Sequence, residues 1–253
     1  MPNKISPCAC LLLVSALCAI SFAQEITEVP VCDEFKNPNL AQKIKKGSIE
    51  ELNVFDAGPG SYAASQGLAT SFLENKAKAP RRPADTPPAE YEKVGAWEEA
   101  ATKYELHTCR FCPKRAFDRS TASAWCEGVK GNGAGQILLV PLWKRGAREI
   151  EIRPGYAKSK SLFLANNRPR KIRAYLLAAD KIKVHQYGDL LSGVKVVARR
   201  EVTLADENKF QKIEFEDVPS NSESFRLVAI EILSVYKGRR YPDTCISEVR
   251  ATR

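Results

Sequence analysis

The second half of the sequence predicts an all-β domain built as a two-sheet sandwich. Short apolar or alternating runs recur there, separated by clusters of glycine, proline, asparagine and aspartate, and this pattern is typical of short strands joined by turns. Helical periodicity is weak over the same residues. The eight candidate strands cover residues 136–143, 149–153, 171–177, 181–187, 194–204, 209–215, 225–235 and 245–250.

Two of these runs also predict which faces of their strands are buried. Residues 137–140 read Ile-Leu-Leu-Val, a continuous apolar run that is expected of a strand covered on both faces. Residues 149–153 read Glu-Ile-Glu-Ile-Arg, and this strict alternation indicates one buried and one wet face. The sequence therefore places the first strand inside the domain and the second with one face toward solvent.

The first 23 residues predict a secretory signal peptide. Lys4 precedes an apolar run over residues 10–22, and Ser21-Phe22-Ala23 supplies a small-x-small cleavage site. The run is shorter than the roughly 20 apolar residues of a membrane-spanning helix, and no later segment approaches that length. We therefore expect an exported protein, whether secreted, periplasmic or at the cell surface, with no transmembrane segment.

Residues 24–100 are interpreted as a leader or linker. Asn37-Pro38 could begin a short helix carrying Leu40, Ile44, Ile49 and Leu52, which Gly47 interrupts. Prolines at 80, 83, 87 and 88 follow among charged residues, and such Pro-rich segments act as semi-rigid spacers. The predicted organisation is thus a signal peptide (1–23), a tether (24–100) and a β-domain (101–253).

Charge is distributed unevenly between these regions. Residues 24–100 carry 9 basic and 13 acidic side chains, a net charge of −4, whereas residues 101–253 carry 29 basic and 17 acidic ones, a net charge of +12. A basic domain attracts anionic partners by the sum of its surface charge. The alternative is that the excess charge only keeps the domain soluble.

Five cysteines remain after signal-peptide removal, at positions 32, 109, 112, 126 and 245. Disulfides are expected in an exported chain, and the odd number leaves one cysteine free or paired between chains. Cys109-Arg110-Phe111-Cys112 has the spacing of a redox pair or of half a zinc site, but only His107 lies nearby as a further ligand. A local bridge, or a bond from one of these two to Cys32, is the preferred interpretation.

Three segments in order carry a family resemblance. Residues 117–135 contain Ser-Thr-Ala-Ser-Ala-Trp-Cys-Glu-Gly and a glycine-rich loop, residues 152–172 contain Arg-Pro-Gly-Tyr and Asn-Asn-Arg-Pro-Arg, and residues 233–249 contain Tyr-Lys-Gly and Tyr-Pro-Asp-Thr-Cys-Ile-Ser-Glu-Val. Together they resemble the NADase-type glycan-binding domain, a bacterial member of the discoidin-like, galactose-binding-like group. The resemblance covers residues 101–253.

The resemblance implies a discoidin-like jelly-roll sandwich whose loops at one end bind carbohydrate, without catalytic machinery. A sandwich of this kind would bring Cys126 and Cys245 together, which makes a disulfide between them plausible. The sequence departs from the pattern where Asp118 is followed by Arg119 and not by Gly-Asp. Because Arg119 adds positive charge to a loop that holds calcium in related folds, we expect no cofactor and regard structural calcium as doubtful. Residues 178–204 are longer than a hairpin and predict an insertion.

The ligand-binding candidates lie in the three loops that the resemblance groups together. Trp125 is either a sugar-stacking or, preferably, a core residue, and the Asn166-Asn167 pair either shapes a turn or contacts ligand. Asp243 is preferred as a salt-bridge partner of Arg168 or Arg170. The full candidate set is Trp125, Glu127, Tyr156, Lys158, Asn167, Arg168, Tyr236, Arg239, Tyr241 and Asp243.

The function that these observations favour is an exported, non-catalytic carbohydrate-binding or adhesion module, with an acidic glycan as a candidate ligand. The alternative is a protein–protein scaffold of the cell envelope or extracellular space that uses the same sandwich. Specific nucleic-acid binding is not expected, because the sequence shows neither the stacked aromatic residues nor the repeated basic helices that would make it specific. The chain has two histidines and no hydrolase motif, so an enzyme is not expected either.

Overall fold

The computed structural model describes residues 36–54, 67–142, 144–185, 188–216, 218 and 224–252, so the expected signal peptide and Cys32 lie outside the described residues. Its helices and strands are, in chain order, α1 (Leu40–Lys46), β1 (Ser48–Val54), β2 (Leu68–Ala69), α2 (Tyr91–Thr108), the 3₁₀ helix η2 (Pro113–Ala116), β3 (Trp125–Cys126), β4 (Ile137–Pro141), β5 (Glu149–Pro154), α3 (Lys160–Ala165), β6 (Arg168–Ala179), β7 (Lys181–His185), β8 (Gly188–Thr203), β9 (Gln211–Glu214), β10 (Phe225–Tyr236) and β11 (Cys245–Ala251).

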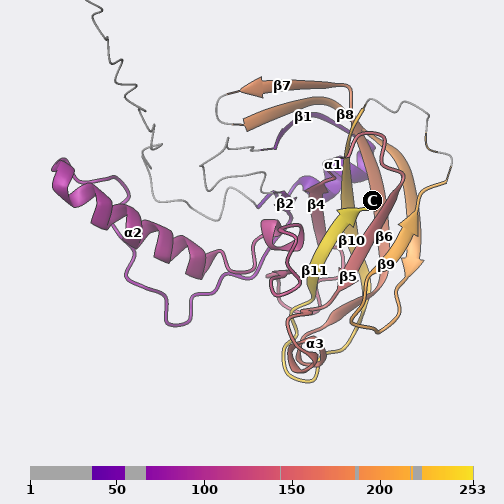
Figure 1. Cartoon of the computed structure of the whole chain (residues 1–253). Helices are drawn as coiled ribbons and strands as arrows, with labels where there is room; N and C mark the ends of the chain where they lie inside the picture. Colours follow the sequence, from indigo (N-terminus) through magenta and orange to yellow (C-terminus); the bar gives the residue numbers. More distant parts are fainter. Residues whose placement is uncertain are drawn as a thin grey trace, which may run out of the picture.

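Two antiparallel sheets form the body of the molecule (Figure 1). The larger sheet has the order β1-β8-β6-β10-β4-β2, with β7 paired to β8, and the smaller has the order β3-β11-β5-β9. Strands that are neighbours in a sheet are mostly far apart in the sequence, as β10 between β4 and β6 illustrates. The predicted all-β sandwich is confirmed.

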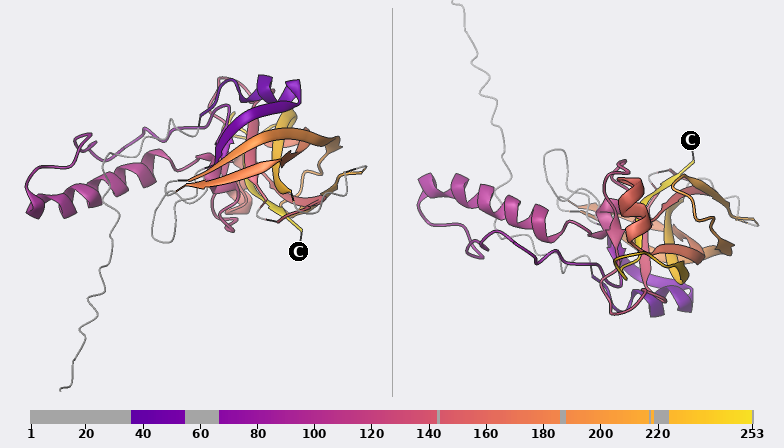
Figure 2. Two further views of the ribbon diagram at one scale, coloured as in Figure 1. Left: turned by 90° about the horizontal axis from the view of Figure 1, so that it is seen from above. Right: turned by 90° about the horizontal axis from the view of Figure 1, so that it is seen from below.

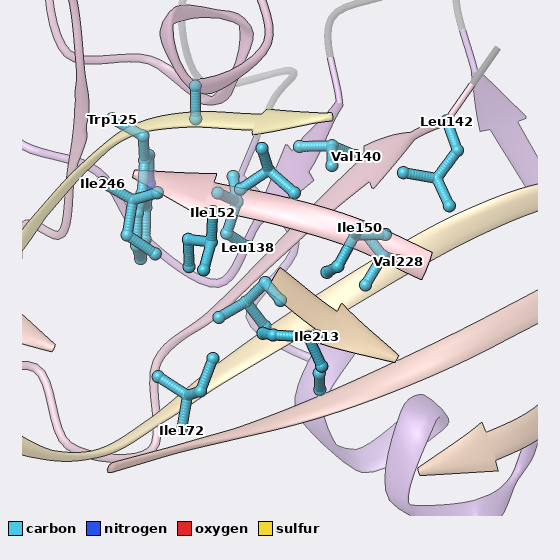
Figure 3. Packing of buried hydrophobic residues seen from close by; sticks show 14 of the residues in the cluster. Trp125, Leu138, Val140, Leu142, Ile150, Ile152, Ile172, Ile213, Val228 and Ile246 are labelled. Carbon is cyan, nitrogen blue, oxygen red and sulfur yellow. The ribbon is translucent and has the colours of Figure 1, made fainter. Parts of the chain in front are cut away.

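The core lies between the two sheets and follows the predicted periodicities. Ile150 and Ile152 of β5 are fully buried and alternate with more exposed residues. They pack with Leu138 and Val228 of the larger sheet (Figure 3). All five residues of β4 are buried, because the neighbours of Leu138, such as Leu139, belong to a second apolar cluster on the outer face of the sheet.

The tether interpretation of residues 24–100 is wrong for residues 36–54 and 67–73, which pack on the sandwich. β1 pairs with β8 at one edge of the larger sheet, and β2 pairs with β4 near the other. Leu40 and Ile44 of α1 are buried in the same apolar cluster as Leu139, Tyr175 and Leu177. The physical reason is that the outer face of the larger sheet is apolar and requires a cover, which this segment provides.

Gly47 ends α1, as its position in the sequence indicated. It adopts φ 87°, and its N–H donates to the Ile44 carbonyl. This left-handed conformation is costly for residues with a Cβ atom but open to glycine, which makes glycine a common helix terminator. The chain then turns directly into β1, so that Ile49 and Leu52 join the same apolar cluster as Ile44.

Helix α2 was not predicted, and it spans the expected domain boundary at residue 101. It projects from the sandwich as an arm (Figures 1 and 2), and Trp97, Ala101 and Thr108 are its only buried residues. Such a narrow apolar stripe gives little helical periodicity to detect. The Pro-rich segment lies against the helix, since Trp97 Nε1 donates to the Ala84 carbonyl at 2.8 Å.

Residues 181–203, within the segment where an insertion was expected, form a long β-hairpin. β7 pairs with the first part of β8, and the second part of β8 pairs with β6. β8 therefore begins at Gly188, six residues before the strand expected at 194–204. The hairpin extends beyond the sandwich together with β1 (Figure 1).

We predict that Ile44→Ala lowers the free energy of unfolding by about 2–4 kcal/mol, because it leaves a cavity beneath α1. Lys43→Ala changes an exposed neighbour on the same helix and is expected to shift stability by less than about 0.5 kcal/mol. Chemical denaturation of the two variants measures both values. Equal, small effects would mean that α1 does not contribute to the folded core.

Candidate functional site

The three segments that carry the resemblance meet at one end of the sandwich, around α3 (Figure 1). Isolated bridges join Asn167 to Thr244 and Gly155 to Ile246. The disulfide between Cys126 and Cys245 links the first and third segments across 119 residues, as expected. We call this region the loop end, defined as residues 127–135, 155–167 and 237–244.

Glu127 ties the glycine-rich loop to the third segment. The carboxylate accepts the Val129 N–H at 2.8 Å and the Thr244 N–H at 3.1 Å, and the side chain is fully buried. Burial raises the pKa of Glu127, while these two hydrogen bonds act in the opposite direction. A Cβ atom on Gly133 would lie 2.4 Å from Glu127 Cγ, so the loop can close over the carboxylate only with glycine there.

Asn167 fixes the shape of the third loop. Its Oδ1 accepts the Gly238 N–H at 2.7 Å, and its Nδ2 donates to the Pro242 carbonyl. The side chain is buried, so the turn-shaping interpretation accounts for its contacts. Main-chain bonds from Arg239 and Arg240 to the end of α3 complete the attachment.

Arg168 is buried and forms a forked ion pair with Asp206. Its Nε and Nη2 donate to the two carboxylate oxygens at 2.9 and 2.7 Å, and its Nη1 donates to the carbonyls of Asn166 and Lys237. The expected pairing of Asp243 with Arg168 is therefore wrong. Asp206 enters from the loop before β9, and no local pattern in the sequence identified it.

The aromatic candidates face inward to different extents. Trp125 is fully buried, with Nε1 donating to the Ser71 carbonyl, so the core interpretation holds and a stacking role for Trp125 is wrong. Tyr156 is buried edge-on against Phe111. Tyr236 is half-buried, and its hydroxyl donates to the Leu204 carbonyl.

The exposed candidates are Lys158, Arg239 and Tyr241, while Asp243 is half-buried. Burial raises the pKa of the Asp243 carboxyl. The Arg240 guanidinium lies 5.1 Å from the centre of the Tyr241 ring. Further exposed cations surround them, and we call the whole set the basic rim: Lys158, Lys160, Lys237, Arg239, Arg240 and Tyr241.

The five cations of the basic rim have no acidic partner among the described residues. Within the described part of the chain, none of them forms an ion pair, although many other basic residues do; Lys195 pairs with Asp180, for example. Unpaired cations on a rigid support leave their hydrogen-bond donors available to an anionic ligand. Sequence analysis named Lys158 and Arg239 as candidates but missed Lys237, for which the basic character of the loop was the available signal.

The remaining cysteines correct one expectation. Cys109 is disulfide-bonded, while Cys112 is a buried free thiol, so the local Cys109–Cys112 bridge is wrong. Burial raises the pKa of the Cys112 thiol. The alternative bond to Cys32 lies outside the described residues. Over those residues, no group of three or more His, Cys, Asp or Glu side chains is placed to hold a metal.

The loop before β3 lies beside Glu248 of β11, and these residues are the candidates for holding the calcium ion that the resemblance implies. Glu248 is 2 % exposed, and its Oε2 has no hydrogen-bond partner. Burial and the nearby charge of Asp118 raise the pKa of Glu248 to about 8. The Glu248 carboxylate accepts main-chain hydrogen bonds from Arg119 and Ser120, and Asp118 accepts hydrogen bonds from Ser120 and Ser123. The one unpartnered oxygen, Glu248 Oε2, near a second carboxylate fits a hard cation, with other ligands supplied by backbone or water oxygens. Asp118 and Glu248 would hold it, and it would neutralise their repulsion.

Arg119 does not remove this fit. Its side chain is exposed, and its backbone adopts φ 62°, a left-handed conformation that glycine favours. The loop therefore keeps a glycine-like turn at the position where the related pattern has glycine. The Arg119 side chain is exposed to solvent, although Arg119 and Glu248 line the same cavity.

Taken together, the two sheets and the disulfide-linked loop end define a discoidin-like sandwich. The chain belongs to the family described as the NAD glycohydrolase translocation F5/8 type C domain, whose model matches residues 90–252. The resemblance inferred from the sequence is thereby confirmed. A comparison with curated proteins finds no match.

Among solved structures, the chain is similar to three family 32 carbohydrate-binding modules. The module of C. perfringens NanJ in complex with galactose has 18 % identity and a TM-score of 0.35, over 55 % of this chain and 83 % of that one. A module from a Clostridium perfringens family 31 glycoside hydrolase has 13 % identity and a TM-score of 0.35, over 56 % and 85 %. The AlyQ module in complex with 4,5-unsaturated mannuronic acid has 12 % identity and a TM-score of 0.31, over 55 % and 83 %.

The elevated pKa of Glu248 predicts a specific pH dependence in metal-free buffer. A carboxyl whose pKa is about 8 in the folded state and ordinary in the unfolded state binds more protons when folded. Its contribution to stability is therefore present at low pH. It is lost as the pH rises from the ordinary value of 4.5 to about 8, by up to about 1.4 kcal/mol per pH unit.

Glu248→Gln keeps the shape of the side chain and removes the titration. The difference in free energy of unfolding between wild type and Glu248→Gln, measured by urea titration in EDTA from pH 5 to 8.5, should shift steadily in favour of the variant. A difference that is constant over this range would show that Glu248 has an ordinary pKa in the folded protein.

Proposed function

We propose that the loop end binds acidic carbohydrate and that the protein is an exported adhesion module without catalytic activity. The observation that carries the proposal is the basic rim, in which five unpaired cations and the exposed Tyr241 sit on loops held by internal hydrogen bonds and a disulfide.

The chemistry of the rim suits carboxylated or sulfated sugars. The planar guanidinium groups of Arg239 and Arg240 present paired donors that match carboxylate and sulfate oxygens. The exposed ring of Tyr241 offers an apolar surface to a sugar and a hydroxyl at its tip. Since Asn167 already fixes the loop, little conformational freedom is lost on binding, which favours affinity.

A non-catalytic role is supported by the acidic groups of the same loops. Glu127 is buried and occupied by main-chain donors, Asp243 is half-buried, and the three loops contain no histidine. Glycoside hydrolysis generally requires two carboxyl groups flanking the scissile bond. The alternative role, a protein–protein scaffold, would use the same surface for an acidic protein.

Export is part of the proposal and rests on residues 1–23 of the sequence. Among the described residues, no helix is both long and apolar enough to cross a membrane. N-terminal sequencing of the protein recovered from outside the cytoplasm should begin at Gln24. A protein retained in the cytoplasm with its first residues intact would contradict export.

The direct test is a glycan array probed with residues 24–253, because the segment before residue 101 belongs to the folded core. We predict binding to uronate-containing, sialylated or sulfated glycans that weakens as salt increases. Arg239→Ala combined with Arg240→Ala should reduce affinity at least tenfold, which corresponds to about 1.4 kcal/mol.

Lys181→Ala is the matched control, since it removes an exposed cation from β7, outside the loop end. It should leave binding unchanged. Equal losses of affinity in both variants would mean that binding depends only on the net charge of the protein. A complete absence of glycan binding by the wild-type protein would favour the alternative role as a protein–protein scaffold.

We further propose that Asp118 and Glu248 hold a structural calcium ion. Bound calcium would stabilise the folded state by mass action, so 5 mM calcium, on the order of a weak extracellular site, should raise the melting temperature of the wild-type protein. Glu248→Gln should abolish that increase. An equal effect of calcium on both proteins would place the ion elsewhere.

A further inference from the structure

A second surface lies on the flank of the sandwich, along the free edge of β11. β3 pairs with β11 only at Cys245 and Ile246, and β5 pairs with the opposite edge from Glu248 to Ala251. No described strand therefore lies beside β11 on the β3 side after Ile246. An unpaired strand edge offers a row of main-chain donors and acceptors to another extended chain.

The direction of these main-chain groups follows from one hydrogen bond. The Thr252 N–H donates to the Glu149 carbonyl of β5. Because residues along a strand alternate in the direction of their main-chain groups, Arg250 also faces β5, while Val249 and Ala251 face the free edge. No bond from either of these two residues to a further element is found among the described residues.

A cavity of about 730 Å³ opens beside this edge. Its apolar lining includes Phe117, Pro141, Leu142 and Phe210, which come from three separate segments of the chain. Pro141 is the last residue of β4 in the opposite sheet, and Leu142 follows it directly, so the cavity occupies the open side between the two sheets. A strand added to β11 would direct alternate side chains into this space.

The charged residues around the mouth of this cavity indicate which peptide side chains would fit. Arg119, Lys144 and Arg250 line the cavity, and Arg119 forms no ion pair within the described part of the chain. The Lys144 ammonium group bonds to the Thr252 carbonyl at 2.8 Å, which holds it at the end of the free edge. Arg250 is already paired with Glu151 at 2.7 Å, and Glu248 is the acidic residue of the lining. Arg119 and Lys144 are therefore the cations that can meet acidic side chains of a ligand.

The lining favours a peptide over a saccharide. The guanidinium groups of Arg250 and Arg153 already lie over the Phe210 ring, 3.9 and 5.5 Å from its centre. Phe117 packs against the core. The cavity thus lacks the free aromatic face on which a sugar ring would stack, whereas the main-chain groups of Val249 and Ala251 suit an extended polypeptide.

We propose that the free edge of β11 binds an extended acidic peptide of a partner protein by strand addition. This interaction is separate from the loop end and does not depend on carbohydrate binding. The peptide backbone would pair with Val249 and Ala251, and its apolar side chains would enter the cavity. Its acidic side chains would reach the cations at the mouth of the cavity.

The test is an array of blocked octapeptides in which valine alternates with aspartate or glutamate, with valine–lysine peptides as the matched set. Residues 24–253 should bind the acidic set selectively. Hydrogen exchange with a binding peptide should slow at the amides of Val249 and Ala251, and N-methylation of alternate peptide residues should weaken binding at least tenfold, because it removes the paired N–H groups.

Lys144→Glu should weaken binding about tenfold, and Lys144→Ala should weaken it less; their melting temperatures establish that both variants fold. Arg240→Glu, at the loop end, is the control and should leave peptide binding unchanged. The proposal is overturned if neither peptide set binds, if lysine peptides bind equally, or if the two β11 amides gain no protection. A sulfated oligosaccharide that protects these amides in place of the peptide would also overturn it.

Discussion

The arrangement of the loop end depends on the junction between β3 and β11. Trp125 pairs with Ile246 and Cys126 with Cys245, and the disulfide makes this register permanent. In the chain-entropy model, a cross-link over 119 residues contributes on the order of 4–5 kcal/mol by restricting the unfolded chain. The junction also fixes the starting points of two loops that lie far apart in the sequence. With these starting points fixed, the hydrogen bonds of Glu127 and Asn167 need to order only the short loop segments between them.

The strands were predictable because their information is local. The alternation in β5 and the continuous apolar run in β4 both reflect which faces are buried, and both were interpreted correctly. The packing of α1 and β1 on the larger sheet was not predictable. It depends on an apolar outer face that is formed by several strands together and is not visible in any single segment. Helix α2 escaped detection for the opposite reason, because it buries few side chains and leaves little periodicity.

The location of the candidate site was predicted more accurately than the residues that are exposed there. Trp125, Glu127 and Arg168 lie in or directly beside the loops of the loop end, but their side chains are buried. A buried polar side chain that bonds to main-chain groups has the same amino-acid identity as one that bonds to a ligand. Asp206 shows the same limit, since its pairing with Arg168 joins residues 38 positions apart. Exposure separates the two classes and leaves the basic rim as the surface available to a ligand.

The most direct measurement of the central claim is a nuclear magnetic resonance titration of the isotopically labelled protein with a sulfated or uronate-containing oligosaccharide. We expect shift changes confined to the loop end, strongest around Lys158, Lys160 and residues 237–241, with the disulfide-linked residues Cys126 and Cys245 unaffected. Shift changes centred on the outer face of the larger sheet or on α2, with the basic rim unaffected, would contradict it.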